Sequence, residues 1–150
     1  MKFHDAVLSL ANVAQAGTIN GSLLTIPEGN GEEQRIGRKI TLKSIMVRGH
    51  IMLPGGTTLS QASETVRFIL LQDTQCNGAN AIITDLLETA NYRSFNNLAN
   101  SSRFRVLYDR CFSMNASGGS GDGTTDNHLQ HERVFNIYKK CSIPIAGRPE

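Results

Sequence analysis

The amino-acid sequence predicts an all-β protein, a sandwich or barrel of antiparallel strands with one short inserted helix. Several segments are rich in β-branched residues or alternate between apolar and polar residues, as strands do. Turn-forming stretches rich in Gly, Pro, Asn and Asp separate these segments, and only one short segment favours a helix. The length of 150 residues fits a single domain, residues 1–150.

The first confident strand is predicted over residues 35–51, RIGRKITLKSIMVRGHI. Its Ile, Thr and Val side chains are stiff at χ1 and pack well on a pleated surface, and Gly49 disfavours a helix. Strict alternation would place Lys39 and Lys43 on one face of this strand and Arg48 on the other.

The second strand, residues 64–72, is almost continuously apolar, so we expect burial on both faces. A short helix over residues 84–90, with Thr84 as N-cap, is expected as an insert between strands. The third strand, residues 103–114, alternates and should place one set of side chains on a single face, namely Phe104, Val106, Tyr108 and Phe112.

Residues 116–127, ASGGSGDGTTDN, contain little apolar surface, and we expect a flexible glycine-rich surface loop there. Residues 133–141 then return to alternation and predict a further strand. Residues 6–10 and 22–26 are weaker strand candidates near the N-terminus.

Composition limits the possible functions. The formal net charge is only +2, so attraction to a polyanion must come from an uneven charge distribution. Cys76, Cys111 and Cys141 are widely spaced and odd in number, which favours free thiols in a reducing compartment. No apolar run approaches the roughly 20 residues of a membrane span, and we expect a soluble, non-exported protein.

The sequence predicts no catalytic residue, no metal ligand and no cofactor. His128 and His131 lie three residues apart, but neither their order nor their surroundings match a zinc motif. Asp73, Asp85 and Glu88 lack a nearby histidine and are better explained by helix capping and turns. We therefore expect a protein that is not an enzyme.

The candidate binding residues are five cations within the segment that begins the first strand, a segment that contains no acidic residue: Arg35, Arg38, Lys39, Lys43 and Arg48. Arg103 and Arg105 are possible additions. They could contact nucleic-acid phosphates without reading base sequence. An ordinary solvated strand face, or salt bridges between subunits, explains the same pattern equally well. The chain has no Trp and its aromatic residues fit core positions, so base stacking is not expected.

Four blocks in order carry a family resemblance: INGSLLTIPEGNGEEQRIGRKITLKSIMVRGHI, ETVRFILLQDTQCNGANAIITDLLETA, FNNLANSSRFRVLYDR and VFNIYKKCSIPI. Together they resemble the capsid proteins of circular, Rep-encoding single-stranded DNA viruses, the circovirus-like group. This resemblance implies a viral jelly roll of two four-stranded sheets that self-assembles into a small icosahedral shell. It further implies a virion protein, assembled inside the host cell, whose partners are capsid subunits and single-stranded DNA, with no membrane.

Two departures from that family modify the expectation. Its members usually begin with an arginine-rich arm, whereas residues 1–20 contain Lys2 as their single Lys or Arg. The chain also predicts fewer strands than the eight of a jelly roll, so its C-terminal strands are expected to be missing and one sheet edge to be open. A stand-alone β-barrel module for single-stranded nucleic acid is the alternative function, and an enzyme on a β-sandwich is the least favoured.

Overall fold

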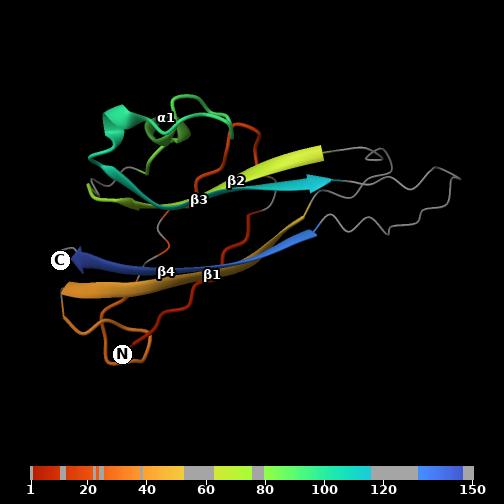
Figure 1. Ribbon diagram of the computed structural model, residues 1–150. Coiled ribbons are helices and arrows are strands. Elements are labelled where there is room, and N and C mark those ends of the chain that lie inside the picture. The colour runs from red at the N-terminus through yellow and green to blue at the C-terminus, as the bar shows by residue number, and fades with distance from the viewer. Residues whose placement is uncertain are drawn as a thin grey trace, which may run out of the picture.

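The molecule consists of two facing layers of antiparallel β-structure (Figure 1). The computed structural model describes residues 2–10, 13–21, 23, 26–37, 39–52, 63–75, 80–115 and 132–146. Within these residues, β1 (Lys39–Met52) pairs with β4 (Glu132–Ala146), and β2 (Ser63–Asp73) pairs with β3 (Phe104–Asn115). The expectation of an all-β sandwich with one short inserted helix is confirmed.

The chain passes between the layers in a nested order. The last strand, β4, returns to lie beside the first, β1, while β2 and β3 pair with each other in the opposite layer. This is the Greek-key order 4-1-2-3 divided between two sheets, as in viral β-sandwiches.

An aromatic cluster lies between the two layers. Phe135 of β4 packs against Phe68 of β2 and Phe112 of β3, with ring centroids 5.5 and 5.7 Å apart. Phe135 also lies opposite Gly49 of β1, where a Cβ atom would approach the ring to 2.9 Å. Gly49 therefore leaves room for this ring. Among the described residues, seven apolar side chains are buried: Leu70, Leu87, Phe104, Phe112, Met114, Ile137 and Ile143.

A register shift interrupts the pairing of β1 and β4. The shift lies between Leu42 and Ser44, and Cys141 on β4 donates through Sγ to the carbonyl of Leu42 at 3.5 Å. Leu42 lies opposite Ile143 and Ser44 opposite Lys140, so the extra residue of the shift belongs to β4. Alternation therefore reverses along β4, whereas it runs uninterrupted along β1 as the sequence predicts.

A second shift, between Leu70 and Leu71 of β2, has the same effect on β3. Phe104 and Val106 lie opposite Asp73 and Leu71, whereas Tyr108 and Phe112 lie opposite Leu70 and Val66 on the core side; this placement follows from the paired register. The prediction that these four β3 side chains share one face is wrong for the same physical reason.

The insert between β2 and β3 covers the outer face of β2–β3 (Figure 1). It contains α1 (Ile83–Leu86) and a 3-10 turn, η1 (Leu98–Asn100). Its underside forms a cavity against Ile69, Leu71 and Val106, which explains why β2 is at least half-buried along most of its length. The expected burial of β2 on both faces is thus produced by the second sheet and this insert.

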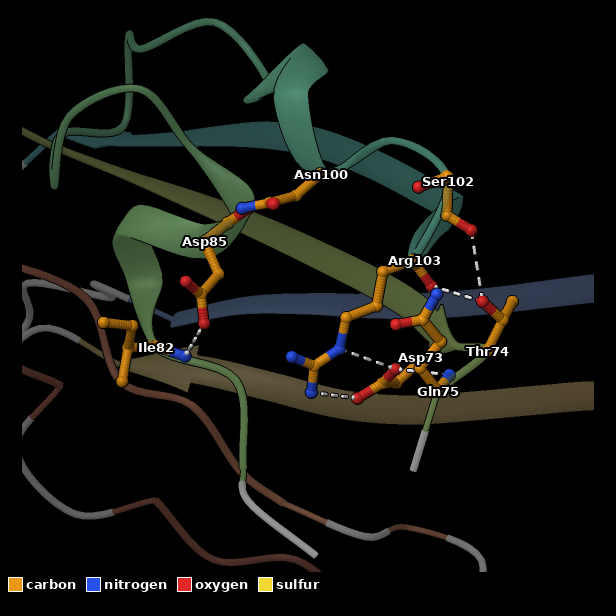
Figure 2. Close-up of polar contacts among 8 residues, drawn as sticks. All are labelled: Asp73, Thr74, Gln75, Ile82, Asp85, Asn100, Ser102 and Arg103. Atoms are coloured by element: carbon orange, nitrogen blue, oxygen red, sulfur yellow. Dashed lines mark hydrogen bonds and ion pairs between the residues drawn. The ribbon is translucent and has the colours of Figure 1, made fainter. Parts of the chain in front are cut away.

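The helix of the insert is shorter than predicted and begins differently. Asp85 Oδ2 accepts a hydrogen bond from the backbone N–H of Ile82 at 3.1 Å, and Asn100 Nδ2 donates to the carbonyl of Asp85 at 3.0 Å (Figure 2). Thr84 is thus inside the helix rather than its N-cap. The chain leaves the helix at Leu87, which is extended and buried, because apolar burial outweighs the weak propensity for further turns.

The N-terminal segment runs along the side of the sandwich without regular structure. Lys2 Nζ donates to the carbonyls of Gly31 and Gln34 at 2.8 and 3.1 Å, and Gly17, at φ +93°, lies against Ile83. The segment therefore connects the loop before β1 to the insert of the other layer (Figure 1). The strand predicted over residues 6–10 is absent there, and most of residues 22–26 lie outside the described residues, as do residues 116–127, His128 and His131.

Candidate nucleic-acid interface

The sheet formed by β1 and β4 carries a strong excess of positive charge. Its strands contain one acidic residue, Glu132, and six cationic ones, all of them exposed: Lys39, Lys43, Arg48, Arg133, Lys139 and Lys140. We call the side of this sheet that carries Arg48, Lys140 and the exposed Tyr138 the cationic face; alternation places the other four cations on the reverse side. Within the described part of the chain, none of these six cations forms an ion pair with a carboxylate.

The predicted binding residues divide into two groups. Lys39, Lys43 and Arg48 are all exposed on β1. The register shift adds its extra residue to β4, so alternation along β1 places Lys39 and Lys43 on one side of the sheet and Arg48 on the other, as the sequence predicts. Arg48 therefore shares the side of Met46 and Tyr138.

Arg35 does not belong to this surface. Its side chain is only 17% exposed, forms an ion pair with Glu28 at 3.1 Å and donates through Nη1 to the carbonyl of Gly37 at 2.6 Å. These contacts close the loop before β1, whose backbone also links Arg35 to Pro27 and Gly29. Arg35 is a structural residue here, and Arg38 lies outside the described residues.

The cations of β4 were missed by the sequence analysis. Lys140 lies opposite Ser44 and Lys139 opposite Ile45, so Lys140 shares the side of Met46 and Arg48 whereas Lys139 points to the other side. The adjacent pair Lys139-Lys140 was visible in the sequence. Its contribution depends on pairing between strands about 90 residues apart, which no local pattern reveals.

Exposed apolar side chains lie among these cations. Met46 is 53% exposed and lies directly opposite Tyr138, which is 57% exposed; Val134 and Met52 are 72% and 63% exposed. The prediction that the aromatic residues occupy the core is therefore wrong for Tyr138. Alternation in β4 points it outward, opposite to the buried Ile137.

The charges of the β2–β3 sheet are arranged in the opposite way. Arg67 donates to both carboxylate oxygens of Asp109 at 2.8 and 2.6 Å, to Asn96 Oδ1 at 3.0 Å and to the carbonyls of Ser94 and Tyr92 at 2.5 and 3.3 Å. The hydrogen bond with Asp109 raises the pKa of Arg67 despite burial. This guanidinium therefore joins the insert to the sheet and is not available to a ligand.

A second ion pair closes the end of the same sheet. Arg103 donates through Nε and Nη2 to the two carboxylate oxygens of Asp73 at 3.1 and 2.8 Å (Figure 2). These bonds, with a backbone bond from Gln75, lower the pKa of Asp73. Arg103 thus has a structural role, whereas Arg105 is exposed on the sheet opposite to the cationic face.

Other site chemistry is limited among the described residues. They hold no group of three or more His, Cys, Asp or Glu side chains placed to bind a metal ion. The thiols of Cys111 and Cys141 are free, Cys111 being exposed. In the part of the chain that the structure covers, no helix is long and apolar enough to cross a membrane.

Comparison with known proteins gives two matches. The family model described as satellite tobacco necrosis virus coat protein matches residues 2–146. The coat protein of Maize white line mosaic Satellite virus is 36% identical over 145 residues, which covers 82% of this chain. The chain spans 63% of the length of that relative.

These matches confirm a coat-protein family and correct the kind of virus to which it belongs. The expected structural rather than catalytic role agrees with a coat-protein family. The assignment to circovirus-like DNA viruses is wrong, because strand patterns of a β-sandwich specify a shell-forming fold but not the genome inside it. The chain belongs to the satellite tobacco necrosis virus coat protein family.

Proposed function

We propose that this chain is a coat-protein subunit that associates with copies of itself to form the shell of a satellite virus particle. The family match over residues 2–146 is the observation that carries this proposal. Two features of the described residues support it. Each two-stranded sheet has open edges, and the insert exposes a group of large apolar side chains, which are Ile82, Phe95 and Leu98 at 61, 80 and 77%.

Open edges and exposed apolar groups both favour contact between protein chains. An unpaired strand edge presents backbone N–H and C=O groups to another chain, and aromatic residues are enriched in interfaces. Arg67 holds the insert to its sheet, so the exposed apolar side chains of the insert are fixed in position. These side chains are well suited to contact a neighbouring subunit.

The nucleic acid inside the shell is expected to be RNA, because satellite viruses carry RNA. The cationic face is the surface of this chain best suited to meet its phosphates. Arg48 and Lys140 have no carboxylate partner in the described part of the chain, so binding phosphate would break no existing ion pair. The face would bind the RNA backbone without reading its sequence.

Electron microscopy of the purified chain tests assembly. We expect closed particles of uniform size, and sedimentation should show a species much heavier than the 16.4 kDa chain. Phe95→Asp should reduce particle formation, because it places a charge in the exposed apolar group. Thr89→Asp, an exposed polar position of the same insert, is the matched control and should assemble normally.

A chain that remains monomeric at high concentration, with RNA or without it, would contradict the shell. The cationic face also supports a second candidate, a stand-alone module for single-stranded nucleic acid. Salt-dependent RNA binding by a strictly monomeric chain would favour that candidate.

A further inference from the structure

We propose that Tyr138 is a base-stacking platform and that the cationic face therefore binds single-stranded RNA in preference to duplex RNA. The proposal rests on the RNA-binding part of the proposed function and names the form of RNA that is bound. The observation behind it is the juxtaposition of an exposed aromatic ring with cations on one sheet face. Tyr138 is 57% exposed in the middle of β4.

The neighbours of Tyr138 follow from the strand register. Met46 lies directly opposite it, at a typical Cβ separation of about 5 Å. Along β4, Lys140 is the next residue on the same side, about 7 Å away, and across the sheet Arg48 follows Met46 by two residues. The Tyr138 ring thus lies beside the apolar Met46 and between the positive charges of Lys140 and Arg48.

This arrangement matches what a single strand requires. Its phosphates need cations at intervals, and its unpaired bases expose π faces that stack on aromatic side chains. A duplex can use the cations but not the ring, because its bases are stacked on one another. Tyr138 should therefore add affinity for single strands alone.

The alternative occupant of this face is a second copy of the chain. Charge argues against it, since two cationic faces would repel each other and the sheet offers Glu132 as its single acid. A single-stranded nucleic acid can occupy the whole face, because its phosphates pair with the cations and its bases stack on the ring.

The test compares binding of an unstructured single-stranded RNA and a duplex RNA of equal length. Tyr138→Leu, which keeps apolar bulk and removes the ring, should weaken single-strand binding about tenfold and leave duplex binding within about twofold. Tyr138→Phe should retain wild-type affinity. Phe95→Leu is the control for loss of an exposed aromatic residue on the insert.

Photo-crosslinking of RNA containing 5-iodouridine supplies a second readout, with Tyr138 expected as the crosslinked residue on the sheet. An equal loss for both RNA forms in Tyr138→Leu, or no loss, would overturn stacking. If Lys140→Gln with Arg48→Gln weakens binding while Tyr138→Leu does not, this face binds RNA but Tyr138 does not stack on its bases, and the proposal is overturned. If Tyr138→Leu blocks particle formation and leaves RNA affinity unchanged, the face is a subunit contact and the proposal fails.

Discussion

The two sheets of this sandwich use their Lys and Arg side chains differently. On the β2–β3 side, Arg67 and Arg103 are both bound to carboxylates, and the insert covers the outer face. On the β1–β4 side, six exposed cations accompany one acid. The comparison shows that the position of an arginine relative to acidic residues decides whether it supports the fold or can bind a ligand. The N–H donors of a paired guanidinium are already engaged by acceptors within the protein.

Arg35 shows the same distinction within a single segment. It lies four residues before Lys39, yet Glu28 and the carbonyl of Gly37 occupy its guanidinium. Lys39 lies in the strand, exposed. Substitutions in the two sheets should therefore separate into losses of stability and losses of binding.

The largest expected effect on stability is that of Arg67→Met. It would remove five hydrogen bonds and leave Asp109 and two backbone carbonyls without their partner, at a cost of about 3 kcal/mol in the free energy of unfolding. Urea denaturation measures this value. Arg105→Met, an exposed arginine of the neighbouring strand, is the control and should stay within about 0.5 kcal/mol. Equal effects of the two variants would show that pairing does not distinguish these arginines.

Phe135→Ala tests the contact that joins the sheets. Its ring reaches both Phe68 and Phe112, so truncation should cost about 2–3 kcal/mol, somewhat below a fully buried phenylalanine because this side chain is half-buried. The matched variant is Val134→Ala, next to it but 72% exposed, with an expected change below about 0.5 kcal/mol. Thermal melting and urea denaturation should agree on this ranking.

Asp73→Asn should show a smaller, pH-dependent effect of about 1 kcal/mol. Arg103 lowers the pKa of Asp73 in the folded state, so the ion pair adds stability above the unfolded pKa of about 3.9. That contribution is lost as the pH falls through the lowered pKa. The difference in unfolding free energy between wild type and variant should therefore be present at pH 6 and shrink below about pH 4. A difference that stays constant to pH 2 would mean that the ion pair contributes nothing.

The smallest effect on stability is expected for the double variant Lys140→Gln with Arg48→Gln, within about 0.5 kcal/mol, because neither cation has an ion-pair partner to lose in the described part of the chain. The same double variant should bind RNA more weakly. The magnitude of the slope of log affinity against log salt concentration should decrease by roughly 0.7 for each cation removed. Arg105→Gln on the other sheet is the control, and an equal fall there would mean that the cationic face has no special role.

The sequence by itself determined the strands, their approximate limits and the class of protein. Apolar and β-branched residues in short segments such as ETVRFILLQ, bounded by turn-forming residues, favour buried strands, so these elements follow from local physics. The four-block resemblance likewise identified a capsid protein. It could not identify the virus, because a β-sandwich pattern carries no information about the genome.

Tertiary structure alone decided which cations and rings share a surface. Pairing between β1 and β4 brought Lys140 and the exposed Tyr138 to the side of Arg48. Neither the partner strand nor the register can be read from a local pattern, since a shift of one residue exchanges the two faces of a strand. The candidate site therefore exists only because two distant strands meet in one particular register.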